Sequence, residues 1–305
     1  MVEKDRSVVV NKPILMKTLP QFYQTHFQSQ LTRAQFLILE ILINLLQSQK
    51  QVRLERLARA FPSPITLEIR RRKIQRFLSL PQLKIQTIWF PSITYWLTTY
   101  CTPSTILYIP IDRTQWGCIN LMMVSLIWDK RAIPLYWELL PKLGSSNWSE
   151  QKAAIQQVLT LFKNYKVVVL GDREFCPVNL GNWLRKQRMY FCLRLKKDEF
   201  IQLEGEIWLR LDAGGLAPGI FLYFQGVKVT KTKKFAGFNV ACKWQGKYQG
   251  WTPEEGWFIL TNLSSISDAI TAYKKRFSIE EMFRDCKSGG YNLEGIGVAN
   301  ERLIQ

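Results

Sequence analysis

The middle of the chain alternates between runs of residues that favour β-strands and segments that favour helices. Strand-like runs of β-branched and aromatic residues cover 106–111, 119–128 and 132–139, and turn residues separate them. A helix capped by Ser149 is expected to run to Phe162, and the fully apolar run 167–170 follows it. The first three runs predict an antiparallel meander. Strands that then alternate with helices predict a central sheet with helical crossovers.

The second half of the chain continues this pattern, except for one segment of different composition. A helix followed by a strand fits 178–195, and then residues 197–256 become glycine-rich and alternate between apolar and polar residues. A buried strand is expected at 257–260, before a helical region that Ser265 or Ser267 opens. The fold class predicted for this part is α/β, a mixed sheet flanked by helices with a β-rich insertion.

The N-terminal region is expected to be all-α. Thr32 can cap a helix over 34–47, a second short helix fits 52–61, and a third covers 66–80. The third helix combines an apolar side with five cationic residues: Arg70, Arg71, Arg72, Lys73 and Arg76. Three short helices with a basic last helix are similar to a helix-turn-helix arrangement, which predicts DNA contact. The alternative is that the five cations form an ordinary solvated face.

The net charge favours a nucleic-acid partner. The chain has 42 Lys and Arg against 24 Asp and Glu, which gives +18. Residues 1–100 hold fifteen Lys and Arg against five Asp and Glu, so over half of the excess lies there. Such an excess is typical of proteins that bind the phosphate backbone. Ribosome association and an anionic membrane surface are the alternatives.

Neither a membrane span nor an export signal is expected. The longest apolar run, 36–46, is interrupted by polar residues and is too short to cross a bilayer. The first residues lack the basic start and apolar core that secretion needs. We therefore predict a cytoplasmic, nucleoid-associated protein. A single histidine and the absence of any CxxC pair argue against a zinc site.

Three acidic residues in distant segments are the candidate catalytic residues. Asp112 and Asp172 each follow an apolar strand, and ligand sites of open sheets collect at strand ends. Glu280 belongs to a set with Tyr273, Arg276 and Lys287, at offsets 0, 3, 7 and 14, which share one side of a helix at about 100° per residue. Three carboxylates are hard oxygen ligands, suited to two Mg²⁺ or Mn²⁺ ions roughly 3.5–4 Å apart.

Structural interpretations stand beside each of these assignments. A lone aspartate after a strand is usually a turn former or helix cap. Tyr273 could be an ordinary core residue, and a capping pattern at Ser278 could start a new helix and interrupt the polar side. Arg113 and Arg173, each next to one of the aspartates, could neutralise the acid or contact DNA.

Three segments in order resemble the motifs of DDE transposases of the IS4 type. They are Ile-Asp-Arg-Thr-Gln-Trp at 111–116, Gly-Asp-Arg-Glu-Phe at 171–175 and the segment 273–283, and the last one extends to Lys287 as Y-x2-R-x3-E-x6-K. The resemblance implies a ribonuclease H-like core in which Asp112, Asp172 and Glu280 bind the two metal ions. It also implies that Tyr273, Arg276 and Lys287 contact DNA phosphates and that a homodimer forms on DNA.

The predicted domain organisation follows from the positions of the motifs and from the change in composition at 197–256. Residues 1–100 would be the helical DNA-binding region, 101–197 the first part of the catalytic domain, 198–256 the β-rich insertion, and 257–305 the remainder. The predicted function is metal-dependent cleavage and strand transfer of double-stranded DNA at the terminal inverted repeats of an insertion sequence. Two alternatives are a nuclease without strand transfer and an inactive DNA-binding remnant. The remnant is considered because related proteins continue through further helices after the last motif, so we expect a C-terminally truncated catalytic domain.

Overall fold

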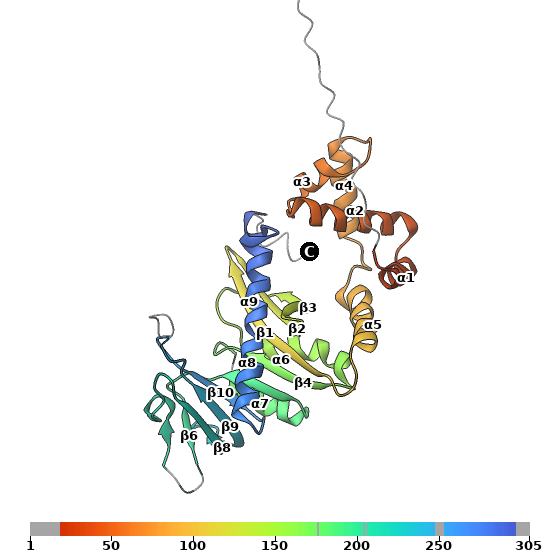
Figure 1. Ribbon diagram of the computed structural model, residues 1–305. Helices are drawn as coiled ribbons and strands as arrows, with labels where there is room; N and C mark the ends of the chain where they lie inside the picture. The colour runs from red at the N-terminus through yellow and green to blue at the C-terminus, as the bar shows by residue number, and fades with distance from the viewer. Residues whose placement is uncertain (1–18, 176, 204, 206, 248–252, 297–305) are drawn as a thin grey trace, which may run out of the picture. The chain divides into compact units, whose positions relative to one another are not determined.

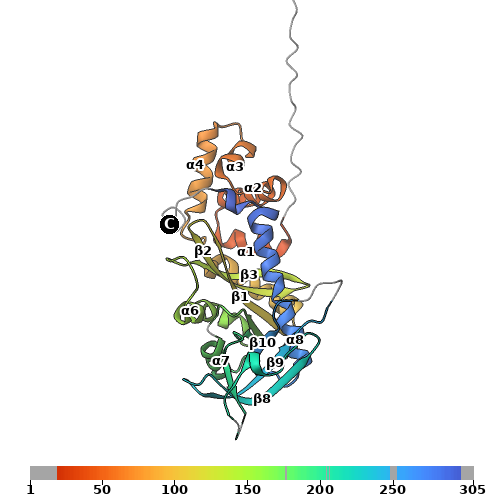
Figure 2. The same cartoon turned by 90° about the vertical axis from the view of Figure 1, so that its left-hand side faces the viewer.

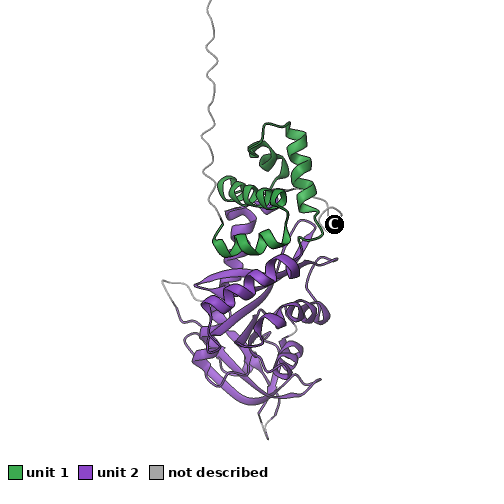
Figure 3. Ribbon diagram, turned by 90° about the vertical axis from the view of Figure 1, so that its right-hand side faces the viewer, with its two compact units in different colours: residues 1–83 green, residues 84–305 purple. Residues whose placement is uncertain are grey.

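The computed structural model describes residues 19–175, 177–203, 205, 207–247 and 253–296. Parts of three regions named above, 1–18, 248–252 and 297–305, lie outside the described residues. The chain forms two compact units, residues 1–83 and 84–305, which Figure 3 colours separately.

The described part of the first unit is helical. Its helices are α1 (Gln21–Gln30), α2 (Arg33–Gln49), α3 (Leu54–Ala60) and α4 (Leu67–Leu78). Thr32 caps α2, as predicted, and Gln35 completes a capping box with it. Helix α4 begins after Thr66 and buries Ile74 and Phe77. Among its cationic residues, Arg72, Lys73 and Arg76 are exposed, whereas Arg70, one turn before Ile74, is partly buried.

The described residues of the second unit form one ten-stranded sheet in the order β3-β2-β1-β4-β5-β10-β9-β8-β6-β7 (Figure 1). The strands are β1 (Ile106–Trp116), β2 (Ile119–Trp128), β3 (Arg131–Leu139), β4 (Lys166–Gly171), β5 (Tyr190–Arg194), β6 (Phe200–Gln202), β7 (Leu209–Arg210), β8 (Phe221–Val229), β9 (Phe235–Lys243) and β10 (Trp257–Thr261). Strands β1, β2 and β3 form the predicted antiparallel meander, while β4 and β5 continue from β1 in parallel. The remaining strands pair antiparallel, and β9 joins β10, so the strands within 198–256 extend the central sheet.

Helices cover both faces of this sheet, as Figures 1 and 2 show. On one face lie α5 (Phe90–Tyr100), α6 (Trp148–Val158) and α7 (Pro177–Lys186); on the other lie α8 (Ile266–Lys275) and α9 (Phe277–Arg284). Strand β4 supplies both cores through its alternation, because Val167 and Val169 pack with the first group of helices whereas Val168 and Leu170 pack with α8. Short helical turns complete the unit: Ile85–Trp89, Leu159–Phe162, Leu211–Ala213, Asp285–Gly289 and Leu293–Ile296.

Two local predictions were wrong. Helix α6 is capped by Asn147, not Ser149, because the Asn147 side chain accepts from the Glu150 N–H while the Glu150 carboxylate accepts from the Asn147 N–H. Asp112 lies inside β1 rather than at its end. Only the parallel pairing with β4 stops at Gly171, and β2 continues to pair with β1 beyond that point.

The helical region that holds Glu280 is nearly continuous. It opens at Ser265, whose side chain accepts a hydrogen bond from the Asp268 N–H. Helices α8 and α9 meet at Arg276, and the backbone there stays right-handed helical, with φ −54° and ψ −34°. No helix starts at Ser278. Throughout the described residues, no helix has the length and apolar character needed to cross a membrane.

Candidate functional site

The three predicted acidic residues meet at one end of the parallel strands. Ile111 of β1 lies opposite Gly171 of β4, so the next residues, Asp112 and Asp172, are neighbours at the same edge. Helix α9 brings Glu280 to the same place. An open cavity of about 480 Å³ forms there, lined by Asp112, Arg113, Asp172, Glu174, Glu280, Phe283, Arg284, Lys287 and Ser288.

Arg276 is the buried counter-ion of this acidic site. Its side chain is 3% exposed and makes two ionic contacts: Nη1 donates to Asp112 Oδ2 at 3.4 Å, and Nη2 lies 2.6 Å from Glu280 Oε1. Nε of Arg276 has no hydrogen-bond partner among the described residues. The pKa of Asp112 is raised to about 7, chiefly by burial; the carboxylates of Glu280 and Asp172 also act to raise it, whereas the charge of Arg276 acts to lower it.

Tyr273 and Arg194 hold Asp172 from two sides. The Tyr273 hydroxyl donates to Asp172 Oδ1 at 3.2 Å, and Arg194 Nη1 lies 3.8 Å from the same oxygen. Tyr273 is fully buried, and burial raises its pKa, so the phenol stays protonated and can donate at neutral pH. Glu255 Oε1 lies 2.7 Å from Arg194 Nη2 and also forms an ion pair with Arg173. Asp172 therefore has a fixed orientation.

Lys287 occupies the outer end of the polar side. It lies in the turn Asp285–Gly289, its Nζ donates to the Gln115 carbonyl oxygen at 3.0 Å, and it stands 3.7 Å from Glu294 Oε1. The four residues of the predicted polar side thus all contact the acidic residues or line the cavity: Tyr273, Arg276, Glu280 and Lys287. The DNA contacts expected of Tyr273, Arg276 and Lys287 stay a prediction.

The donor set suits a hard divalent cation, although the side chains are held by ion pairs in this arrangement. Among the described residues, no group of three or more His, Cys, Asp or Glu side chains is arranged to hold a metal ion. In this arrangement the guanidinium of Arg276 contacts both Asp112 and Glu280. The chemistry nevertheless fits, because Asp112 is a buried carboxylate whose pKa two neighbouring carboxylates raise, and a cation in the cavity would offset that repulsion.

Comparison with known proteins identifies the family. Residues 125–295, more than half of the chain, match the family model described as a transposase DDE domain. The chain belongs to this family. The match includes Asp172 and Glu280 and begins after Asp112.

Similarity to solved structures is distant, and comparison with curated proteins gave no match. A piggyBac transposase synaptic complex with hairpin DNA aligns at 9% identity with a TM-score of 0.46, over 81% of this chain and 57% of that one. Argonaute from Marinitoga piezophila in complex with guide RNA aligns at 10% identity with a TM-score of 0.25, over 55% of this chain and 25% of that one. The chain thus spans little more than half of the transposase it matches.

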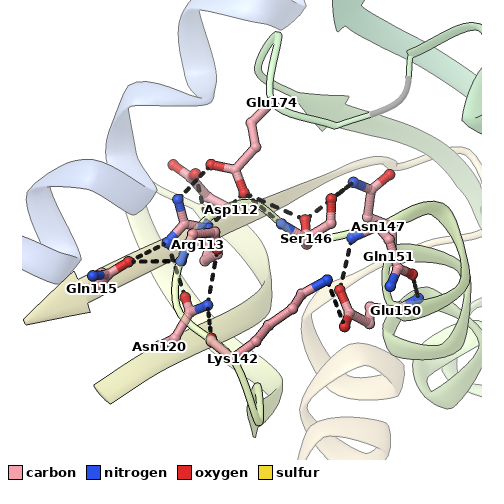
Figure 4. A network of polar contacts seen from close by, with 11 residues as sticks. Asp112, Arg113, Gln115, Asn120, Lys142, Ser146, Asn147, Glu150, Gln151 and Glu174 are labelled. Atoms are coloured by element: carbon pink, nitrogen blue, oxygen red, sulfur yellow. Dashed lines mark hydrogen bonds and ion pairs between the residues drawn. The ribbon is translucent and has the colours of Figure 1, made fainter. Parts of the chain in front are cut away.

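In this DDE domain the two arginines that follow the aspartates pair with other acids. Arg173 binds Glu255, and Arg113 binds Glu174 through Nε–Oε1 at 2.6 Å and Nη2–Oε2 at 2.9 Å (Figure 4). Arg113 also donates to Asn120 Oδ1 at 2.9 Å. These ion pairs are with acids other than the neighbouring aspartates, and DNA contact by Arg113 and Arg173 stays a prediction.

Glu174 and Asn120 extend this pairing into a network that supports the site (Figure 4). Glu174 Oε1 accepts from the N–H and hydroxyl of Ser146, and buried Asn120 donates to the carbonyl oxygens of Lys142 and Gly144. The network therefore connects β1, β2, the segment before α6 and the residues after β4. Glu174 lies within the second motif segment, two residues after Asp172, but the sequence predicted no role for it.

Glu174→Gln is expected to lower the free energy of unfolding by about 1–3 kcal/mol, because it replaces a charge-assisted, two-point contact with Arg113 by a neutral one in a largely desolvated place. Urea denaturation of the two proteins measures the change. Glu281→Gln, at an exposed position of α9, is the matched control and should stay within about 0.5 kcal/mol. Equal effects of both substitutions would contradict a stabilising role of the Glu174–Arg113 ion pair.

Most of the cationic residues of α4 make contacts with other residues of the first unit. Arg71 and Arg72 pair with Glu68, Arg70 donates to the carbonyl oxygens of Ile65 and Arg59, and Lys73 lies over the Phe61 ring. The contacts with Glu68 are exposed, so water and salt weaken them and DNA phosphates can compete for the same side chains. DNA binding by Arg70, Arg71, Arg72, Lys73 and Arg76 stays a prediction.

Proposed function

We propose that this chain is the transposase of an insertion sequence, which cleaves DNA at the element ends and joins the freed 3′-hydroxyl to target DNA. The observation that carries the proposal is the meeting of Asp112, Asp172 and Glu280, from two adjacent parallel strands and a helix, in one open cavity. Membership of the DDE domain family supports the same reaction class. The strand order β3-β2-β1-β4-β5, with an antiparallel first half, supports a ribonuclease H-like core.

Each residue of the site has a distinct role in this proposal. Asp112, Asp172 and Glu280 would hold two Mg²⁺ or Mn²⁺ ions, which when bound activate the attacking oxygen and stabilise the leaving one. Tyr273 orients Asp172 through its hydrogen bond, and Arg276 holds Asp112 and Glu280 in position. Lys287, at the mouth of the cavity, binds a DNA phosphate beside the scissile bond.

The first unit supplies DNA recognition in this proposal. Helix α4 exposes Arg72, Lys73 and Arg76 to solvent, which suits the phosphates of a terminal repeat. A homodimer on DNA would bring two such units to the two ends of the element. The strand-rich segment 198–256 would be the insertion that precedes the last acidic residue.

The test is an assay with the DNA that flanks the gene. Purified protein is incubated with Mg²⁺, a fragment carrying the gene and both of its flanks, and a target plasmid. We expect nicks at two flanking positions and covalent joining to the plasmid, both abolished by EDTA. Cleavage without joining would indicate the nuclease alternative. Binding without cleavage would indicate the inactive remnant, and either result contradicts the proposal.

A further inference from the structure

The carboxylate of Glu255 connects two arginines at the edge of the acidic site. Its Oε1 accepts from Arg194 Nη2 at 2.7 Å and also forms an ion pair with Arg173. The Arg194 side chain is 14% exposed and that of Glu255 28%, so water screens this pair only partly. Glu255 comes from the strand-rich segment 198–256, whereas Arg194 ends β5 and Arg173 follows β4. The segment thus supplies a charged residue to the strand ends beside Asp172.

The backbone that carries Glu255 is held in place by the residues that follow it. Gly256 is buried, and a Cβ atom there would lie 2.5 Å from Leu216 Cδ2 and 3.2 Å from the Lys243 carbonyl oxygen. Glycine allows this close approach because it has no side chain. Trp257 then begins β10 and pairs with Lys243 of β9. The Glu255 side chain therefore starts from a fixed point of the sheet.

Arg194 lies near two carboxylates and hydrogen-bonds to one of them. Nη2 donates to Glu255 at 2.7 Å, whereas Nη1 stays 3.8 Å from Asp172 Oδ1, beyond hydrogen-bond distance. Asp172 Oδ1 accepts instead from Tyr273, and no donor among the described residues reaches Asp172 Oδ2. Asp172 therefore faces the cavity with a carboxylate that Arg194 does not hold.

Without the charge of Glu255, Asp172 would be the acid nearest to Arg194. A guanidinium has five donors in a planar fork, which suits a two-point contact with a carboxylate. Arg194 would then turn to Asp172, in the way that Arg276 contacts Asp112 and Glu280. Such an ion pair would compete with a divalent cation for the oxygens of Asp172.

We propose that Glu255 is a positioning residue, which holds the Arg194 guanidinium away from Asp172 and so keeps the Asp172 carboxylate available to a divalent cation. The inference rests on the proposed function, because it concerns the metal ions expected at the site. Glu255 acts through Arg194, since it is not among the residues that line the cavity. The strand-rich segment thereby contributes to the acidic site through an acid that belongs to none of the three motifs.

The test is a double-mutant cycle in which Mn²⁺ binding to the full chain is measured by electron paramagnetic resonance, without DNA. Glu255→Gln is expected to weaken Mn²⁺ binding roughly tenfold, the effect of one charge-assisted contact. In a protein that already carries Arg194→Gln, Glu255→Gln should change the affinity by less than about twofold, because no guanidinium is left to move. Glu254→Gln is the matched control, since Glu254 is the exposed neighbour with the same charge, and it should also stay within about twofold.

The same weakening by Glu255→Gln with and without Arg194 would show that only the overall charge matters, and it overturns the proposal. An equal loss in Glu254→Gln overturns it too, as does an absence of Mn²⁺ binding in the unsubstituted protein. Circular dichroism shows whether each variant is folded. If Glu255→Gln alone does not fold, Arg194→Gln and the double variant, which has no unpaired Arg194, still decide, because unequal Mn²⁺ affinities of these two contradict the proposal.

A crystal structure of Glu255→Gln in EDTA gives a readout without metal. Arg194 Nη1 is expected to come within about 3 Å of an Asp172 oxygen, and an unchanged separation overturns the proposal. None of these measurements depends on cleavage. A chain that binds Mn²⁺ through this arrangement and does not join DNA contradicts only the proposed function, whereas a chain that joins DNA and binds Mn²⁺ equally well in Glu255→Gln contradicts only the role of Glu255.

Discussion

Asp172→Asn is expected to lower the rate of Mg²⁺-dependent strand cleavage by about 10³-fold or more, and Asp112→Asn and Glu280→Gln should do the same. Each substitution keeps the size of the side chain and removes one anionic oxygen donor. Stabilisation of the reacting oxygens by two metal ions is worth several kcal/mol, and each 1.36 kcal/mol changes the rate about tenfold. The three effects should not add, because the carboxylates act on the same ions.

The measurement is single-turnover cleavage of a labelled flanking fragment, with DNA binding followed separately by gel shift. Binding should be unchanged or tighter in the three variants, because each removes a negative charge near the phosphate backbone. Glu281→Gln is the matched control, since Glu281 is next to Glu280 in α9 but exposed and not part of the cavity lining. Cleavage within tenfold of normal in Asp172→Asn would remove Asp172 from the catalytic set.

The central sheet could be predicted because its signals are local. The apolar runs of β1 to β3 and the fully apolar run 167–170 of β4 set strand positions without reference to the rest of the chain. The cap of α6 was misplaced because Asn147 and Ser149 are both good N-caps. Only the reciprocal bonds between Asn147 and Glu150 decide between them, and those bonds require the folded turn.

The acidic residues could be found from sequence, whereas their partners could not. Asp112 and Asp172 each follow an apolar run, and the parallel register of β1 and β4 then makes them neighbours. Arg194 and Glu255 have no motif of their own. Their places depend on β5 lying next to β4, where Leu193 pairs with Gly171 and puts Arg194 beside Asp172. A correct strand order would have been enough to predict Arg194.

Helical periodicity placed Arg276 correctly but gave no indication of its burial. The pattern showed that Arg276 shares a side of the helix with Tyr273 and Glu280, which the structure bears out. That side faces the sheet edge at Asp112 and Asp172, so a residue expected at a DNA surface is 2% exposed and surrounded by acids. The polar side of this helix is buried because it faces Asp112 and Asp172, and these two acids come from segments that are distant in the sequence.

Arg276→Ala is therefore expected to lower the free energy of unfolding by about 3–5 kcal/mol at pH 8, the usual cost of leaving a buried charge without its partner. The charge left behind is chiefly that of Asp112, whose side chain is 14% exposed. Lys274→Ala, two residues away and exposed, is the matched control and should change stability by less than about 0.5 kcal/mol. Urea denaturation in EDTA measures both variants.

The pH dependence of this loss separates charge from packing. Burial places the pKa of Asp112 at about 7 in the folded protein, above its value of about 3.9 in an unfolded chain, so its ionisation opposes folding. The cost is absent below about pH 4, grows between pH 4 and 7, and is fully present above pH 7. Without Arg276 the pKa of Asp112 rises further, so the two proteins differ in the ionisation of Asp112 only above about pH 7, and the loss should shrink by about 1.4 kcal/mol when the pH is lowered from 8 to 5.

Adding Asp112→Asn to Arg276→Ala should restore stability at pH 8, because the amide removes the uncompensated charge while keeping the size of the side chain. If the loss were the same at both pH values and Asp112→Asn restored nothing, Arg276 would contribute by packing against Tyr273 and Phe277. The restored double variant would also keep its fold without the cation between Asp112 and Glu280. That result would show that Arg276 offsets the repulsion of the carboxylates, the same electrostatic task that a bound divalent cation would perform in this cavity.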